Sequence, residues 1–330
     1  MKNLFFITFL LFTFGCQNAG DYKNSPKTYL DTVFKIIEKH SIMRDSIDLT
    51  KIKEDAYAEI KNIKSLKECH SIVASVLHKL GDNHSAFLEK SYYKHLFAPS
   101  VNEIQRSIFT FDGELLKTNI GFLRIDGLNT ADSITTKEYI DSLQILIKSI
   151  DNIKIKGWIL DLRNDTGGNG WAMLGGLGPL LGDGVFEYLM DINHKKVPFS
   201  YENGDLKIDF KKGFRIRKPY HLFFNNRPIA ILTSHITASA GEMVVIAFRG
   251  KINSRSFGAE TYGVSTAKEL FLLPDSCFLH LTTLIDVDRT GKIYGKAIVP
   301  DSIVHHPFDI NEPYDPVIHA AENWIMNYKN

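Results

Sequence analysis

An apolar strand followed by a glycine turn occurs at Gly157-Trp158-Ile159-Leu160-Asp161-Leu162-Arg163-Asn164-Asp165-Thr166-Gly167-Gly168. Its first six residues form an apolar run that predicts a buried strand. Further strands are expected at 120–125, 228–232 and 278–284, and helices at 137–150 and 239–248. Because strands alternate with helices, this part of the chain is predicted to be an α/β domain.

The segment before this domain has a helical pattern. Apolar residues recur at helical spacing from Tyr29 to Ile37 and again from Leu66 to Leu80. This pattern predicts a mainly helical region over residues 27–92. Gly81 is a natural helix stop. We therefore expect an N-terminal helical bundle over residues 27–98 and the α/β domain over 99–330.

Residues 1–15 have the features of a secretory signal peptide: a lysine near the start, an apolar run, and a small residue at the expected cleavage site. Cys16 follows Gly15 directly and resembles the lipidated cysteine of bacterial lipoproteins, although Phe14 is bulkier than that motif prefers. A plain signal peptide with a chance cysteine is the alternative. We expect an exported cell-envelope lipoprotein, periplasmic if the cell has that compartment, whose residues 16–26 are a lipid anchor and linker.

Composition narrows the function classes. The chain has 330 residues with a formal net charge of +1, so no basic excess indicates a nucleic-acid partner. Apart from Cys16, only Cys69 and Cys277 are present, and both are interpreted as buried small apolar residues. Cys69-His70 has no second ligand pair at zinc spacing. We therefore expect no metal and no organic cofactor.

Gly167 and Gly168 are the first feature that carries chemistry. Adjacent glycines let backbone N–H groups approach a ligand closely, as an oxyanion hole requires. A tight turn with positive φ is the structural alternative, and a phosphate loop is disfavoured because no Lys-Ser or Lys-Thr follows. Asp165-Thr166-Gly167 matches the aspartic-protease triplet, but a homodimer would have to supply the second carboxylate.

Ser239 is the second feature, between a predicted strand and a predicted helix. A serine at such a junction can project its Oγ above the sheet as a nucleophile. The next N–H, on Ala240, lies at the helix N-terminus and could stabilise an oxyanion. The same Ser239-x-x-Glu242 pattern is also a capping box, and taken alone it favours a helix cap.

A serine nucleophile needs a base, and His84 is the candidate. It lies 155 positions before Ser239 (239 − 84), so only the fold can bring the two together. Spacing alone does not select it over the other eleven histidines.

The order of these segments resembles the tail-specific (C-terminal processing) and tricorn-core serine peptidase family over roughly residues 27–306. The resemblance rests on Leu80-Gly81-Asp82-Asn83-His84-Ser85, Leu160 to Gly168, Thr237-Ala238-Ser239-Ala240-Gly241-Glu242, Gly258 to Gly263 and Val299-Pro300-Asp301. It implies a crotonase/ClpP-like core, a peptide or protein substrate, and Ser239 and His84 as nucleophile and base.

Several positions depart from the family pattern. The processing-protease branch has a catalytic lysine where this chain has Val264, and Lys268 is four residues too late. The tricorn-like branch uses a histidine, which fits His84, but its helper glutamate is replaced by Tyr294. Asp288 is the weak substitute for that acid and Asp286 the second choice; a turn aspartate is the alternative interpretation of Asp288.

The segment between Ser91 and the strand at 120 is too short for the PDZ module that the family often carries. The predicted function is acyl transfer to Ser239 with His84 as base and Gly167 or Gly168 and Ala240 as oxyanion donors. Two alternatives stay open. One is a peptide- or ligand-binding lipoprotein on a decayed scaffold, and the other is a hydrolase of non-peptide esters.

Overall fold

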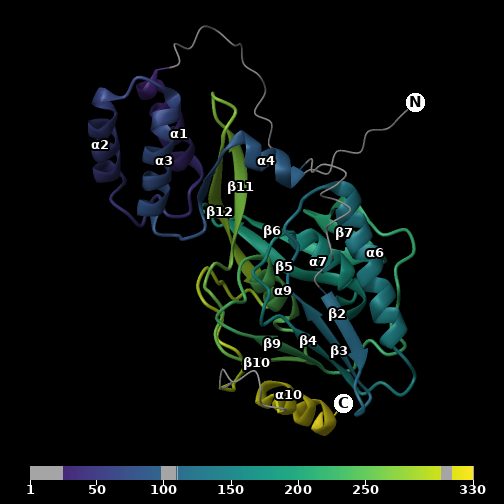
Figure 1. Cartoon of the computed structure of the whole chain (residues 1–330). Helices are drawn as coiled ribbons and strands as arrows, with labels where there is room; N and C mark the ends of the chain where they lie inside the picture. Colours follow the sequence, from purple (N-terminus) through teal and green to yellow (C-terminus); the bar gives the residue numbers. More distant parts are fainter. Residues whose placement is uncertain (1–24, 98–108, 110, 306–313, 330) are drawn as a thin grey trace, which may run out of the picture. The chain divides into compact units, whose positions relative to one another are not determined.

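The computed structural model describes residues 25–97, 109, 111–305 and 314–329 (Figure 1). The chain divides into two compact units. The first contains the described residues up to Leu96 together with Met190–Lys195 and Thr266–Ile285, and the second contains the remainder. Cys16 and the rest of the expected signal and anchor lie outside the described residues.

The first unit is a helical bundle joined to a β-hairpin. Its helices and strands are α1 (Pro26–His40), α2 (Leu49–Glu59), η1 (Ile60–Asn62), α3 (Leu66–Leu80), α4 (Lys90–Phe97), β1 (Ala86–Leu88), β11 (Thr266–Leu272) and β12 (Phe278–Asp288). A capping box at Ser25 starts α1, and Gly81 ends α3 with a φ of 78°. Both β1 and β11 pair antiparallel with β12.

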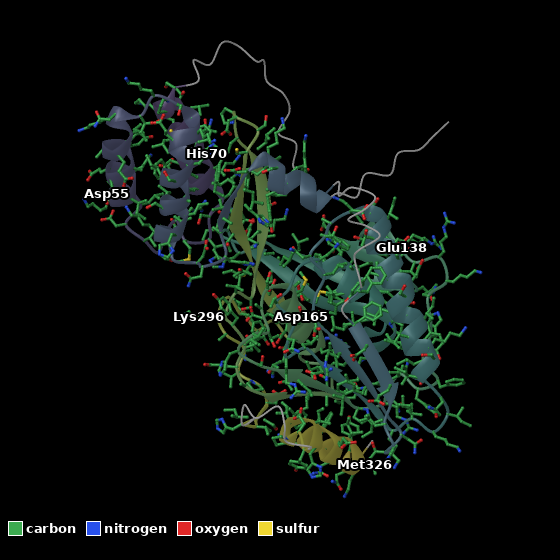
Figure 2. All side chains as sticks on the ribbon, in the orientation of Figure 1. Asp55, His70, Glu138, Asp165, Lys296 and Met326 are labelled. Carbon is green, nitrogen blue, oxygen red and sulfur yellow. The ribbon has the colours of Figure 1, made fainter. Side chains whose placement is uncertain are left out.

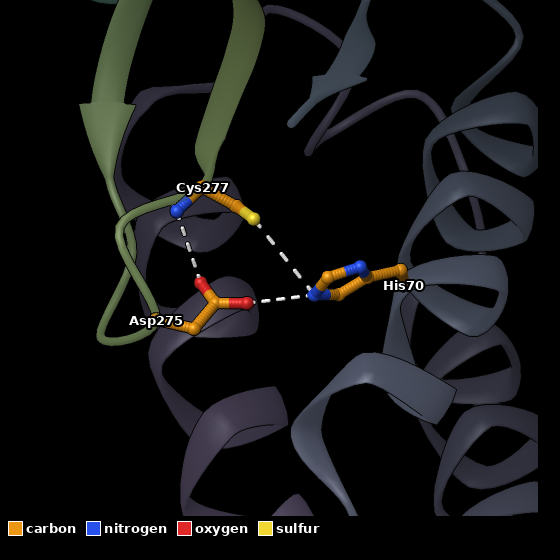
Figure 3. Close-up of side chains that lie close together, drawn as sticks. All are labelled: His70, Asp275 and Cys277. Atoms are coloured by element: carbon orange, nitrogen blue, oxygen red, sulfur yellow. Dashed lines mark hydrogen bonds and ion pairs between the residues drawn. The ribbon is translucent and has the colours of Figure 1, made fainter. Parts of the chain in front are cut away.

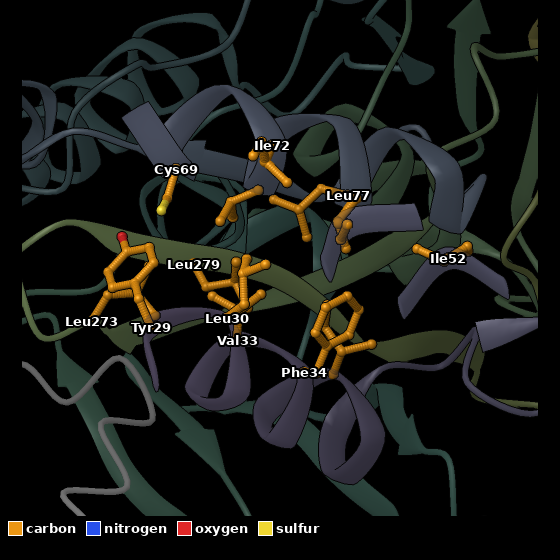
Figure 4. Close-up of a cluster of buried hydrophobic side chains, with 14 of the residues drawn as sticks. Tyr29, Leu30, Val33, Phe34, Ile52, Cys69, Ile72, Leu77, Leu273 and Leu279 are labelled. Atoms are coloured by element: carbon orange, nitrogen blue, oxygen red, sulfur yellow. The ribbon is translucent and has the colours of Figure 1, made fainter. Parts of the chain in front are cut away.

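A hydrophobic cluster holds the bundle to the hairpin (Figure 4). Leu30, Val33 and Leu80 are fully buried, and Leu279 and Leu281 of β12 belong to the same cluster. Burying a side chain of this size contributes about 1.5–3 kcal/mol, so the hairpin is an integral part of this unit.

Six strands form the main sheet of the second unit, in the order β13-β10-β9-β4-β3-β2. Their bounds are Phe111–Leu115 (β2), Ile120–Ile125 (β3), Gly157–Asp161 (β4), Ile229–Thr233 (β9), Ser254–Gly258 (β10) and Ser302–Ile303 (β13). All neighbours are parallel except β2, which is antiparallel to β3. Because β4 and β9 are parallel neighbours, the loops that follow them emerge at the same edge of the sheet.

Among the described residues, the helices that accompany this sheet are α6 (Ser133–Ile150), α7 (Gly170–Gly176), α8 (Gly178–Leu181), α9 (Ala240–Phe248) and α10 (Pro316–Asn327). Helix α10 packs on β4, β9 and β10 and buries Val317, Ala321 and Ile325 against the sheet. Figure 1 shows α7 and α9 on the other side of the same strands. The strands β5 (Gly184–Asp191), β6 (Lys196–Glu202), β7 (Asp205–Ile208) and β8 (Lys211–Arg215) follow one another in a second sheet, in which β7 is antiparallel to both β6 and β8.

The predicted α/β class is confirmed. The boundary expected at residue 98 lies close to Leu96, but residues 266–285, assigned from sequence to the α/β domain, fold with the helical unit. The region 27–92 also contains the short strand β1, because its residues pair with β12. Cys69 and Cys277 are buried free thiols. None of the described helices is long and apolar enough to cross a membrane.

Candidate active site

Ser239 stands at the junction between the loop after β9 and helix α9. Its backbone has φ 52° and ψ −116°, a conformation that a residue with a side chain rarely adopts. Such strain costs on the order of 1–3 kcal/mol and persists only where the surroundings impose it. A strained serine between a strand and a helix is the geometry of a nucleophile elbow.

Glu242, in the first turn of α9, holds this junction in place. Its carboxylate accepts hydrogen bonds from the N–H of Ser239 (3.0 Å), Gly263 (3.0 Å) and Val264 (2.8 Å), and from the Thr261 hydroxyl. Burial raises the pKa of Glu242, and these four donors oppose that rise. The capping box predicted from the sequence is therefore present. Its Glu242 side chain holds the strained Ser239 backbone in place, so a capping box and a strained serine occur together here.

The glycine turn after β4 packs directly against Ser239. Gly167 and Gly168 have φ values of 95° and 121°. A Cβ added at Gly167 would lie 2.9 Å from Ser239 Cβ and 3.0 Å from Ala240 N. A Cβ at Gly168 would lie 2.2 Å from the carbonyl oxygen of Leu128. Only glycine fits either position, and the sequence-predicted Gly167, Gly168, Ser239 and Ala240 form one cluster.

Asp165 fastens the two loops together. Its backbone oxygen accepts from Ala238 N at 2.9 Å, and its Oδ1 accepts from Gly167 N at 2.8 Å. The side chain, labelled in Figure 2, is fully buried, and desolvation raises its pKa to about 8. A partner subunit cannot reach a carboxyl that is enclosed in this way, which argues against the aspartic-protease interpretation of Asp165-Thr166-Gly167.

The arginine of the same segment has a structural role. Arg163 donates two hydrogen bonds to Asp161, from Nε to Oδ1 (2.9 Å) and from Nη2 to Oδ2 (2.8 Å), and a third from Nη1 to Asp315 Oδ2 (2.7 Å). Asp315 is also the N-cap of α10. Paired, charge-assisted bonds of this kind fix geometry, so Arg163 ties the end of β4 to the start of α10.

His84 belongs to the first unit and lies in a tight turn between α3 and β1. Asp82 Oδ1 accepts from the N–H of His84 (2.9 Å) and of Ser85 (2.7 Å), and Asn83 has a φ of 53°. Ser85 Oγ accepts from Thr282 N at 2.9 Å, which anchors the turn on β12. The turn is therefore fixed at both ends.

The partner of the His84 ring is a hydroxyl that the sequence analysis missed. His84 Nδ1 lies 2.8 Å from Thr266 Oγ1, on β11. Burial, together with the neighbouring Lys268 and His280, lowers the pKa of His84 to about 3. Burial also lowers the pKa of Lys268 to about 8. No local pattern marks Thr266, because 182 positions separate it from His84.

Asp288 is engaged within its own turn. Its carboxylate accepts from Thr290 N (2.8 Å), the Thr290 hydroxyl (2.6 Å), Lys292 N (3.1 Å) and the Tyr294 hydroxyl (2.7 Å). These contacts fit the alternative interpretation of a turn aspartate. Asp286, the second choice, is buried, as is Glu187. Burial and then the charge of Glu242 raise the pKa of Asp286, and burial and then the charge of Asp286 raise the pKa of Glu187.

The model of peptidase family S41 matches residues 119–304, which is more than half of the chain. The chain belongs to peptidase family S41. The match covers both the glycine turn and Ser239, whereas His84 lies before it.

Relatives extend the similarity beyond that segment. The nisin-resistance protein of Lactococcus lactis is 27% identical over 279 residues, covering 84% of this chain and 83% of that protein. A carboxy-terminal-processing protease of Bartonella bacilliformis is 27% identical over 210 residues, which are 62% of this chain but only 43% of that protein.

Solved structures of other proteins share this fold. A lipoprotein from Streptococcus agalactiae superposes with a TM-score of 0.72 at 26% identity, covering 94% of this chain and 99% of that one. The photosystem II D1 C-terminal processing protease has a TM-score of 0.55 at 14% identity, covering 85% and 93%, and shows a shared fold. Membership of S41, together with homology to processing proteases, identifies the chain as a serine-type peptidase, which is a hydrolase.

Proposed function

We propose that this S41 peptidase hydrolyses peptide bonds through an acyl-enzyme on Ser239, with His84 as the general base. The observation that carries the proposal is the strained backbone of Ser239 against the glycine turn. A helix cap needs no such strain, since N-cap residues ordinarily have extended backbone. The Ser239 conformation therefore favours a nucleophile.

The oxyanion donors follow from the hydrogen bonds of the turn. The Gly167 N–H donates to Asp165, so we assign the hole to the N–H groups of Gly168 and Ala240. Ala240 is the first residue of α9, where the helix dipole favours negative charge. In the first step the Ser239 oxygen bonds to the substrate carbonyl carbon while its proton moves to His84.

His84 then gives that proton to the leaving amine as the C–N bond breaks, and water hydrolyses the remaining ester. We propose that Thr266, in the place of an acid, orients the imidazole by accepting from Nδ1–H, which leaves Nε2 as the basic nitrogen. Lys268 is the alternative base, since its lowered pKa makes a neutral amine accessible.

The proposed substrate is a peptide met outside the cytoplasm. Cys16 is proposed as a lipid anchor, which the similarity to a streptococcal lipoprotein supports. The nisin-resistance protein acts in resistance to a peptide, so short antimicrobial peptides are a specific class to test. We also propose that no PDZ module selects substrate C-termini here.

Digestion of a peptide mixture, followed by mass spectrometry, tests the mechanism. Ser239→Ala and His84→Ala should each reduce cleavage by at least about 10³-fold, and the double variant should be little worse because the pair acts as a unit. If the double variant lost as much activity as the two single losses multiplied together, the assignment of Ser239 and His84 as nucleophile and base would be contradicted. If Lys268→Met abolishes cleavage while His84→Ala does not, Lys268 is the base. A folded wild-type protein that cleaves nothing would favour the peptide-binding alternative.

A further inference from the structure

Three side chains of metal-binding type converge in the first unit, and none of them is assigned to catalysis (Figure 3). His70 comes from α3, whereas Asp275 and Cys277 come from the turn between β11 and β12. Their ligand atoms all lie within 4.8 Å of one another. His70 Nε2 is 2.6 Å from Asp275 Oδ2 and 3.8 Å from Cys277 Sγ.

The direction of these contacts distinguishes a metal site from a catalytic triad. In a Cys-His-Asp triad the thiol and the carboxylate face opposite nitrogens of the imidazole ring. Here both face the same nitrogen, Nε2. Three donors that converge on one point can share a cation, whereas they cannot relay a proton through the ring.

The surroundings hold each donor in its orientation. Asp275 Oδ1 accepts from the Tyr29 hydroxyl and from Cys277 N, both at 3.1 Å, which turns Oδ2 toward His70. The His70 ring packs on Phe87 with its centroid 4.6 Å away. Outer contacts of this kind fix the ligands of metal sites.

The turn that carries two of the donors is itself rigid. Leu273 N donates to Cys277 O at 2.9 Å, and Ser276 N donates to Leu273 O at 3.0 Å. The side chains of His70 and Asp275 keep 17% and 15% of their exposure, so the site has access to solvent. A cation can therefore enter a preformed arrangement.

We propose that His70, Asp275 and Cys277 form a binding site for one divalent transition-metal ion of the zinc class, with water completing the coordination. Nitrogen, carboxylate and thiolate together are a ligand set that suits Zn²⁺ and excludes Ca²⁺ and Mg²⁺, which prefer oxygen alone. In a tetrahedral site the nitrogen and sulfur would be about 3.5 Å apart and the nitrogen and oxygen about 3.3 Å. The short Nε2–Oδ2 contact would open by less than 1 Å when the cation replaces the hydrogen bond.

Binding displaces the thiol proton of Cys277 to solvent and leaves a metal-bound thiolate. The bound ion would link α3 to the tip of the hairpin, whose far end carries Thr266. We expected no metal from the sequence because no second ligand pair lies at zinc spacing from Cys69-His70. Asp275 and Cys277 lie 205 and 207 positions away.

Cobalt titration of the purified full chain, kept reduced with a phosphine, tests the site. Co²⁺ should bind at one equivalent with a thiolate-to-cobalt absorption band, and Zn²⁺ should displace it. Cys277→Ala and His70→Ala should abolish the band and weaken binding at least about 100-fold, since loss of an outer contact alone costs 10- to 100-fold. Tyr29→Phe, which keeps all three ligands, should weaken binding roughly tenfold.

Cys69→Ala and His78→Ala are matched controls, because they remove the second buried thiol described in this unit and an exposed histidine of the same helix. Both should bind cobalt as the wild type does. Circular dichroism of every variant checks folding, and Asp275→Asn serves if His70→Ala unfolds. A wild-type protein without the thiolate band, or a folded Cys277→Ala variant with unchanged affinity, would overturn the proposal.

Discussion

Gly168→Ala is predicted to disable Ser239 by displacing the loop that carries an oxyanion donor. The new Cβ would lie 2.2 Å from Leu128 O, and an ordinary contact begins at 3.4 Å, so the backbone must retreat by about 1 Å. A displacement of about 1 Å at a reacting group costs on the order of 10²-fold in rate. We therefore expect the second-order rate of labelling by a fluorophosphonate serine probe to fall about 100-fold.

Gly184→Ala is the matched control. Gly184 has a φ of 120°, against 121° for Gly168, but nothing lies within 4 Å of its added Cβ. Both variants carry a similar backbone strain of about 1–3 kcal/mol, which urea unfolding measures. Only Gly168→Ala adds a steric clash, between the new Cβ and Leu128 O. If Gly168→Ala labels within threefold of the wild type, or Gly184→Ala loses as much, the argument from crowding is refuted.

Three further predictions concern single buried groups. Because burial and neighbouring charges lower the pKa of His84 to about 3, labelling should fall less than twofold from pH 7.5 to 5, whereas a base at the ordinary pKa of 6.5 would lose about 30-fold. Glu242→Gln should slow labelling roughly tenfold by giving Ser239, Gly263 and Val264 a poorer acceptor, whereas the exposed Glu260→Gln should not. Burial raises the pKa of Asp286 to about 8, so the folded state loses stability as pH rises from about 4 to 8. Asp286→Asn should therefore improve the free energy of unfolding by at least about 1 kcal/mol more at pH 8 than at pH 4, and an equal effect at both would contradict this.

The parts of the fold that rest on local pattern could be predicted. The apolar run at 157–162 is realised as β4, and the helical spacing of 66–80 as α3. The placement of 266–285 could not be predicted, because β11 and β12 join the helical unit through a core that only the folded chain creates.

The candidate site divides in the same way. Ser239 and the glycine pair are recognisable because their chemistry lies in short contiguous segments. Three other features depend on side-chain direction or on contacts between distant parts of the chain. They are the hydrogen bond from Gly167 N–H to Asp165, the Thr266 hydroxyl beside His84, and the cluster around His70. Spacing in the sequence carries no information about such contacts.

The proposed mechanism requires Ser239 to be an activated nucleophile. Fluorophosphonate labelling of the purified protein, followed by peptide mass spectrometry, tests it most directly. We expect one adduct per chain, on the peptide that contains Ser239, absent from Ser239→Ala and strongly reduced in His84→Ala. A folded wild-type protein that takes up no probe, or takes it up at another residue, would contradict it.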